Sequence, residues 1–227
     1  MDRRLGDSDP MLNAILFDLD GTLANTDPIH FQIWKDLLHE YGLDIDHAFY
    51  QQHISGRLNV DILQDLLPHL SADDGRTFSG NKEAEFRRRA ARSLTPLAGL
   101  MDLLNWVSDR QLKRAVVTNA PPDNAHFMLQ TLNLDTAFPV VVLGEAVASG
   151  KPHPMPYQEA MRQLDVTPAG CLAFEDSPSG IQSAVGAGIL TIGVATTHDP
   201  ETLERAGATL VVHDFTDSRL HELLNWS

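Results

Sequence analysis

A short apolar run that ends in two carboxylates limits the fold of this chain more than any other stretch of the sequence. Residues 14–17 (AILF) are too few for a buried helix and are typical of a strand buried in a parallel sheet. Asp18 and Asp20 follow at once, ahead of Gly21. Because two buried carboxylates so close together repel each other, a positive group must share their site, and a divalent cation suits it best. In open α/β sheets, the ligand crevice lies at this end of the strands.

The rest of the chain alternates strands with helices, which predicts an α/β fold with a doubly wound parallel sheet and right-handed crossovers. Further strands are predicted over 115–117, 140–143, 171–174, 190–194 and 210–212. Helices are predicted over 28–41, 46–52, 58–67, 83–92, 96–107, 124–132, 155–164, 181–187, 201–205 and 220–224. Between the first strand and the second, the pattern is helical throughout, so we expect an inserted α-helical domain there.

These patterns divide the chain into a tail and two domains. Residues 1–10 are polar and are expected to form a flexible tail. Residues 11–25 and 94–227 are expected to form the core domain, and residues 26–93 the α-helical insert. The first helix of the insert is expected to begin with Asp27 as its N-cap, directly before a proline.

Charge and cysteine content restrict the partners and the compartment. The formal net charge of −14 over 227 residues argues against binding to nucleic acid or to anionic membranes. No apolar run is long enough to cross a bilayer, and no signal-peptide pattern opens the chain. The one cysteine, Cys171, allows no disulfide within the chain and is expected to be a small buried hydrophobe. We therefore expect a cytoplasmic protein, as a monomer or a weak homodimer.

Polar residues stand at the ends of several predicted strands, or in the loop that follows one in the case of Lys151, and a parallel sheet brings these ends to one edge. Besides the first two carboxylates, these residues are Thr118, Asn119, Lys151, Glu175 and Asp176. Carboxylates at this density suit a hard cation such as Mg²⁺, which also accepts oxygen ligands from a substrate phosphate. An ammonium and a hydroxyl suit a phosphoryl group, and a carboxylate can act as a nucleophile that forms an aspartyl-phosphate.

Taken together, these residues resemble the four motifs of the haloacid dehalogenase-like (HAD) hydrolase superfamily. The motifs are residues 18–22 (DLDGT), Thr118, Lys151 and the Glu175-Asp176 pair, in the right order over nearly the whole chain. Each motif alone is weak, but the set is specific. The insert resembles the α-helical cap of the subfamily that includes β-phosphoglucomutases, phosphoglycolate phosphatases and small sugar-phosphate phosphatases. The resemblance implies a Rossmann-like core with an inserted cap.

The resemblance also implies a role for each motif residue. Asp18 would attack phosphorus, and Asp20 would protonate the leaving oxygen and then activate water. Thr118 would hydrogen-bond a phosphoryl oxygen, helped by the backbone N–H groups of Leu19 and Asn119. Lys151 would neutralise the nucleophile and the group in transfer. The implied Mg²⁺ ligands are Asp18, the backbone carbonyl of Asp20, Asp176, and Glu175 directly or through water.

The cap is expected to determine which substrate is bound. His30, Arg57 and Lys82 resemble cap residues of β-phosphoglucomutases, where the His orients a sugar hydroxyl and the Arg grips a distal phosphate. The loop after Thr118 departs from that pattern, because Ala120 and Pro122 lack the polar side chains that usually contact the phosphate there. This departure favours a phosphatase over a mutase. The residues 22–27 and 93–95 are expected to be hinges for cap closure.

The leading hypothesis is therefore a Mg²⁺-dependent phosphatase that hydrolyses a small phosphorylated metabolite, such as a sugar phosphate or phosphoglycolate. A sugar-phosphate mutase of the β-phosphoglucomutase type is the first alternative. A hydrolase of carbon–halogen bonds is a second, which Asp20 argues against because such enzymes lack an acid at that position. A non-catalytic binding protein on the same fold is a third, and the complete motif set argues against it.

Overall fold

A computed structural model describes residues 12–226, so the predicted tail 1–10 lies outside the described residues. One six-stranded sheet forms the centre of the chain, with every pairing parallel. Its strands are β1 (Ala14–Phe17), β2 (Lys113–Thr118), β3 (Val140–Leu143), β4 (Cys171–Glu175), β5 (Leu190–Val194) and β6 (Leu210–Val212). The strand order is β3-β2-β1-β4-β5-β6, which confirms the predicted doubly wound parallel sheet.

The strand order reverses at β1, and this reversal creates the crevice. The chain builds β2 and β3 on one side of β1 and then crosses to β4, β5 and β6 on the other side. Phe17 of β1 lies in register with Val116 of β2 and with Phe174 of β4, so three strands end at nearly the same level. Residues that follow these three strands therefore meet at one edge, at the switch point where open α/β sheets bind ligands.

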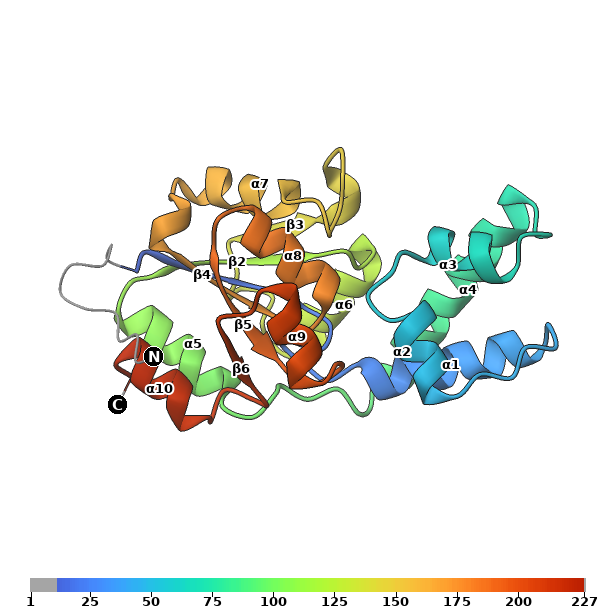
Figure 1. The fold of residues 1–227 in the computed structure, drawn as a ribbon, viewed down its shortest axis with the longest axis horizontal. Helices are drawn as coiled ribbons and strands as arrows, with labels where there is room; N and C mark the ends of the chain where they lie inside the picture. Colours follow the sequence, from blue (N-terminus) through green and yellow to red (C-terminus); the bar gives the residue numbers. More distant parts are fainter. Residues whose placement is uncertain (1–11, 227) are drawn as a thin grey trace.

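Helices cover both faces of the sheet, as Figure 1 shows. One face packs against α5 (Leu100–Asp109), α6 (Pro122–Thr131) and α10 (Ser218–Leu224), and the other against α7 (Met155–Leu164), α8 (Pro178–Gly186) and α9 (Pro200–Ala206). Alternate side chains of β1 belong to the two cores: Ile15 and Phe17 to the first, Ala14 and Leu16 to the second. All four are fully buried, as expected for a central parallel strand. Two short 3-10 helices, at Gly144–Ala146 and Pro168–Gly170, complete the core domain.

Four helices form a separate lobe, the cap, at one end of the molecule (Figure 1). They are α1 (Asp27–His39), α2 (His47–His53), α3 (Asn59–Leu66) and α4 (Ala72–Ala90). The cap has its own apolar cluster, which includes Trp34, Leu38 and Phe78. Ile33 of α1 and Phe86 of α4 belong instead to the main core cluster, so the base of the cap packs against the core domain.

Several helix starts differ from the sequence prediction, and three of the differences have a clear physical reason. Helix α4 begins at Ala72 and not at 83, because Ser71 caps it by accepting a hydrogen bond from the Asp74 N–H, and its first half is too polar to show an apolar stripe. Helix α5 begins at Leu100 and not at 96, because Gly99 adopts a left-handed conformation (φ 76°). A Cβ atom at position 99 would also lie 2.7 Å from the backbone carbonyl carbon of Phe215, which leaves room only for glycine. Asp27 is the first residue of α1 and not its N-cap, which is Thr26.

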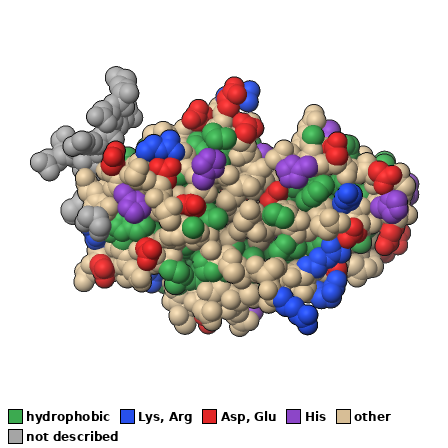
Figure 2. Space-filling view, turned by 90° about the horizontal axis from the view of Figure 1, so that it is seen from below, with side chains coloured by type: hydrophobic (Ala, Val, Ile, Leu, Met, Phe, Trp, Pro, Cys, Tyr) green, Lys and Arg blue, Asp and Glu red, His purple; other side chains and the backbone are tan. Residues whose placement is uncertain are grey.

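The surface carries most of the acidic excess. In Figure 2, acidic side chains are spread over the face shown, and the largest group of Lys and Arg side chains lies at one edge of the cap end. Within residues 12–226, no helix combines the length and the apolar character that a membrane crossing requires. Cys171 is buried and forms no disulfide, as predicted. With a net charge of −14, a phosphorylated ligand must find its positive groups locally.

Candidate active site

The strand-end residues come together at the edge of the sheet. Carboxylate oxygens of Asp18, Glu175 and Asp176 lie within 4.8 Å of one another, and all three side chains are buried. The backbone N–H of Asp18 donates to the carbonyl of Phe174 at 2.9 Å, which ties the end of β1 to the end of β4. Residues more than 150 positions apart in sequence thus form one acidic cluster, because adjacent parallel strands end together.

Lys151 supplies the positive charge inside this cluster. Its Nζ lies 2.5 Å from Asp18 Oδ1 and 2.5 Å from Glu175 Oε1, and its side chain is almost fully buried. The Tyr157 hydroxyl donates a further hydrogen bond to Glu175 Oε1 at 2.8 Å. Although burial lowers the pKa of Lys151, the charges of Asp18 and Glu175 raise it well above its usual range. Lys151 is therefore a permanent ammonium that neutralises one of the three carboxylates.

The remaining charge in the cluster is unbalanced. Burial, together with the neighbouring charge of Glu175, raises the pKa of Asp18 from 3.8 to about 7, even though Lys151 lowers it. Burial and the charges of Asp18 and Glu175 raise the pKa of Asp176 well above its usual value. When all three carboxylates are ionised, they and the one ammonium leave two negative charges, which a divalent cation would neutralise.

The cluster also has the donor chemistry and the space for a hard cation. Glu175 Oε2 is buried and has no hydrogen-bond partner among the described residues, so one carboxylate oxygen is free to bind an ion. Two glycines leave room for the acidic side chains. A Cβ on Gly21 would lie 2.0 Å from Asp176 Oδ2, and one on Gly180 would lie 1.8 Å from Glu175 Oε2. The buried oxygen ligands fit Mg²⁺ better than a soft metal.

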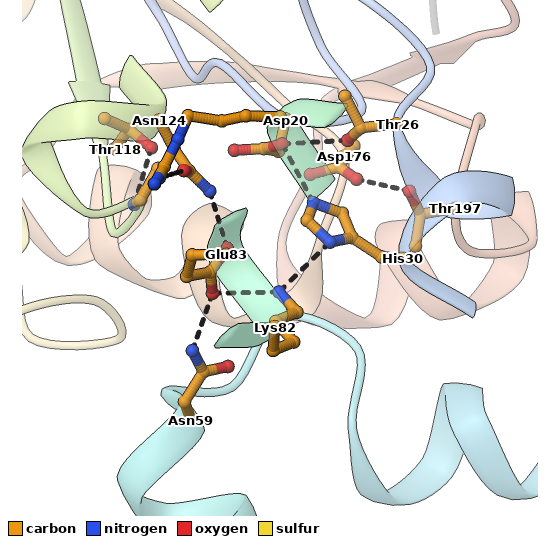
Figure 3. A network of polar contacts seen from close by, with 12 residues as sticks. Asp20, Thr26, His30, Asn59, Lys82, Glu83, Thr118, Asn124, Asp176 and Thr197 are labelled. Atoms are coloured by element: carbon orange, nitrogen blue, oxygen red, sulfur yellow. Dashed lines mark hydrogen bonds and ion pairs between the residues drawn. The ribbon is translucent and has the colours of Figure 1, made fainter. Parts of the chain in front are cut away.

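Asp20 lies between the acidic cluster and the cap, as Figure 3 shows. Its Oδ1 accepts a hydrogen bond from Thr26 Oγ1 at 2.9 Å and lies 3.3 Å from Nε2 of His30. Although burial raises the pKa of Asp20, the hydrogen bonds from His30 and Thr26 lower it below its usual value. Because both contacts go to Oδ1, the other carboxylate oxygen is left for a substrate or a water molecule.

Thr118 and Asn119 line the other side of the crevice. Thr118 is 1% exposed, and its Oγ1 accepts the N–H of Ala120 at 2.9 Å, which leaves the hydroxyl proton free to donate. The Asn119 side chain accepts the Lys151 N–H at 3.1 Å and donates to the Lys151 carbonyl at 3.2 Å. Asn119 therefore holds the lysine loop in place with its side chain, and the contact of its N–H with phosphate remains a prediction.

A cavity of about 480 Å³ joins the acidic cluster to the cap, and all three predicted cap residues line it. His30 lies between Asp20 and Lys82, whose Nζ is 3.1 Å from His30 Nδ1. The His30 ring also stacks on Phe86, with ring centroids 4.2 Å apart. Arg57 donates to Asp65 at 2.6 Å and to the His53 carbonyl at 2.9 Å. The roles predicted for His30, Arg57 and Lys82 toward a substrate remain predictions.

The structure adds residues that the sequence analysis did not identify. Thr197, in the loop after β5, donates from its hydroxyl to Asp176 Oδ2, and Tyr157 of α7 holds Glu175. Thr197 is three residues beyond the predicted strand 190–194. The criterion that selected Thr118, a polar residue near the end of a predicted strand, therefore applies to Thr197 as well. The apolar face of α7 gave no such signal for Tyr157, which looks like an ordinary core aromatic.

Comparison with known proteins places these residues in a family. Residues 15–194 match the haloacid dehalogenase-like hydrolase family. Validoxylamine A 7'-phosphate phosphatase from Streptomyces hygroscopicus subsp. limoneus is 33% identical, over 92% of this chain and 97% of its own. A phosphorylated carbohydrates phosphatase from Thermotoga maritima is 31% identical (88% and 94%), and β-phosphoglucomutase from Bacillus subtilis is 29% identical (94% and 94%).

A solved structure has the same fold. CbbY from Rhodobacter sphaeroides, as a variant in complex with xylulose-(1,5)bisphosphate, superimposes with a TM-score of 0.81. It is 27% identical, and the match covers 91% of this chain and 96% of that one. The resemblance that the motifs indicated is therefore confirmed. With its parallel core, its helical cap and the family match over residues 15–194, the chain belongs to the haloacid dehalogenase-like hydrolases.

Proposed function

We propose that this protein is a Mg²⁺-dependent phosphatase that hydrolyses a small phosphorylated sugar through an aspartyl-phosphate on Asp18. The observation that carries the proposal is the buried cluster of three carboxylates around Lys151, open to a cavity beneath the cap. The cation would be held by Asp18, the Asp20 carbonyl, Asp176 and Glu175. When bound, it would offset the negative charge that develops on the phosphoryl oxygens.

In the first step, a carboxylate oxygen of Asp18 bonds to phosphorus while the bond from phosphorus to the leaving oxygen breaks. The leaving oxygen keeps the electron pair and takes a proton from Asp20, which gives the free sugar. Lys151 and Thr118 stabilise charge on the group in transfer, with the N–H groups of Leu19 and Asn119. The position of Lys151, 2.5 Å from Asp18, supports this assignment.

In the second step, Asp20 accepts a proton from water, and the water oxygen bonds to phosphorus. The bond between phosphorus and Asp18 breaks, which restores the carboxylate and releases inorganic phosphate. Hydrogen bonds from His30 and Thr26 already favour the ionised form of Asp20 that this step needs. For the first step, an anionic phosphate bound beside Asp20 raises its pKa by charge repulsion, so the proton is taken up as the substrate binds.

The cap supports a sugar monophosphate as the substrate class. Arg57, which is predicted to grip a distal phosphate, is already paired with Asp65. The other predicted cap cation, Lys82, is paired with Glu83. The uncharged polar groups that line the cavity are those of Ser55, Asn59, Ser79 and Ser179, among others. Hydroxyl and amide groups suit the hydroxyls of a neutral sugar better than a second phosphate. This pattern also favours hydrolysis over a mutase reaction that passes through a bisphosphate.

A screen of phosphorylated metabolites tests the proposal. Purified protein is incubated with sugar monophosphates, phosphoglycolate and sugar bisphosphates, with Mg²⁺ or with EDTA, and phosphate release is measured. We expect release from sugar monophosphates that needs the metal and is lost in Asp18→Asn but kept in Asp44→Asn, which alters an exposed cap carboxylate. Conversion of β-glucose 1-phosphate to glucose 6-phosphate without free phosphate, given a catalytic bisphosphate, would instead establish a mutase.

A further inference from the structure

Glu83 of α4 is a buried carboxylate outside the acidic cluster, and it connects the cap to the core domain (Figure 3). Its side chain is nearly buried and both oxygens are occupied. Oε1 accepts from Lys82 Nζ at 2.9 Å and from Asn59 Nδ2 at 2.6 Å, and Oε2 accepts from Asn124 Nδ2 at 2.6 Å. Lys82 and Asn59 belong to the cap, whereas Asn124 belongs to α6 of the core, so Glu83 has all its partners only when the two domains are in contact.

Asn124 is held in one orientation by two opposite charges on α4. Its Nδ2 donates to Glu83, and its Oδ1 accepts from Arg87 Nη1 at 2.6 Å. Glu83 and Arg87 are four residues apart and therefore lie on the same face of the helix. Because reversing the amide would set donor against donor and acceptor against acceptor, only this orientation satisfies both charges. Asn124 is 2% exposed, so water cannot replace these bonds while the domains touch.

The other side of Glu83 leads to Asp20. Lys82 Nζ has only protons to donate, so His30 Nδ1, 3.1 Å away, must accept one and carry no proton itself. The ring proton of a neutral His30 is then on Nε2, which faces Asp20 Oδ1 at 3.3 Å. The position of Lys82 thus sets the tautomer of His30 and the hydrogen bond that orients Asp20. Glu83 in turn holds Lys82.

We propose that Glu83 is a positioning residue that, through its contact with Asn124, aligns Asp20 for proton transfer only when the cap is docked on the core. The proposal rests on the role given to Asp20 in the proposed function. Cap opening separates Glu83 from Asn124, so the carboxylate that holds Lys82 against His30 loses its anchor on the core and keeps only its cap partners. The chain Asn124–Glu83–Lys82–His30–Asp20 connects domain contact to the general acid without touching the acidic cluster.

Two substrates separate an alignment defect from a general loss of activity. A sugar phosphate has a poor leaving group that needs a proton from Asp20, whereas p-nitrophenyl phosphate has a good one that leaves without it. The ratio kcat/KM reports only steps up to the first irreversible one, so the later hydrolysis does not affect it. For Glu83→Gln and for Asn124→Asp, we expect kcat/KM to fall about 30-fold with the sugar phosphate and less than about threefold with p-nitrophenyl phosphate.

A double variant tests the contact itself. In Glu83→Gln combined with Asn124→Asp, the amide introduced at position 83 can donate to the carboxylate introduced at position 124. That carboxylate can still accept from Arg87, and the amide oxygen can accept from Lys82. We expect kcat/KM of the double variant with the sugar phosphate to be at least about tenfold higher than that of either single variant. Independent sites would instead give additive losses of free energy. The control is Glu85→Gln on the same helix, which pairs with Arg88 and Arg89 instead and should keep both activities.

Other outcomes would overturn the inference. Equal losses on the two substrates, in variants that keep the circular dichroism spectrum and melting temperature of the parent protein, would mean a structural role for Glu83. Additive losses in the double variant would mean that the contact between Glu83 and Asn124 is not what matters. Failure of the proposed function is a separate result, because the unaltered protein would then release no phosphate from either substrate.

Discussion

Replacing Lys151 by methionine tests the electrostatics of the acidic cluster. The ammonium is 5% exposed and lies 2.5 Å from both Asp18 and Glu175, so its removal leaves buried carboxylates without a counterion. Loss of one partner of a buried ion pair costs about 3–5 kcal/mol. We expect the metal-free Lys151→Met protein to lose this much free energy of unfolding at neutral pH. The loss should be smaller in acid, where Asp18 and Asp176 take up protons.

Urea unfolding in EDTA, followed by tryptophan fluorescence, measures this loss. The matched control is Lys35→Met on the exposed surface of α1, where we expect a change within about 0.5 kcal/mol. Adding Glu175→Gln to Lys151→Met should restore part of the stability, because it removes one of the unpaired charges. A loss below about 1 kcal/mol for Lys151→Met in EDTA would refute the view that Lys151 balances buried carboxylates.

Three further predictions follow from the site. Asp18→Asn should abolish phosphate release while keeping the circular dichroism spectrum and melting temperature, and retained turnover would remove Asp18 as the nucleophile. Asp65→Asn should free Arg57 from its ion pair and raise the ratio of kcat/KM for sugar bisphosphates to kcat/KM for monophosphates about tenfold. Adding Arg57→Ala should cancel this increase. An unchanged ratio in Asp65→Asn would contradict the argument that Asp65 occupies Arg57. Because folding raises the pKa of Asp18 from 3.8 to about 7, the folded state binds more protons between these values. Asp18 should therefore destabilise the metal-free protein as the pH rises through that range, and Mg²⁺ should raise the melting temperature more at about pH 8 than at about pH 5.

The sequence was sufficient for the features that depend on strand ends. The run 14–17 followed by Asp18, and the run 171–174 followed by Glu175, predicted buried parallel strands whose ends meet, and the structure has this arrangement. Such patterns are local, and the geometry of a parallel sheet converts them into proximity. The same rule extends to Thr197, which lies three residues beyond the end of β5 and contacts Asp176.

Features that depend on packing between helices could not be predicted in this way. Glu83 and Asn124 lie on helices, where no strand end marks them, and they are buried where α4 docks on α6. The start of α4 at Ala72 could not be predicted because the first half of this helix has few apolar residues. The pairing of Arg57 with Asp65 depends on how the loop before α3 folds back, which spacing alone does not determine.

The central claim is that the Asp18 carboxylate takes PO₃ from the substrate, and direct detection of the phosphorylated residue tests it. Asp20→Asn is mixed with p-nitrophenyl phosphate and Mg²⁺, quenched in acid, digested and examined by mass spectrometry. With a good leaving group the first step proceeds, whereas the second lacks its base, so the aspartyl-phosphate should accumulate. We expect one added PO₃ on the peptide that contains Asp18. Release of p-nitrophenol with no phosphorylated peptide, or with phosphate on another residue, would contradict the account.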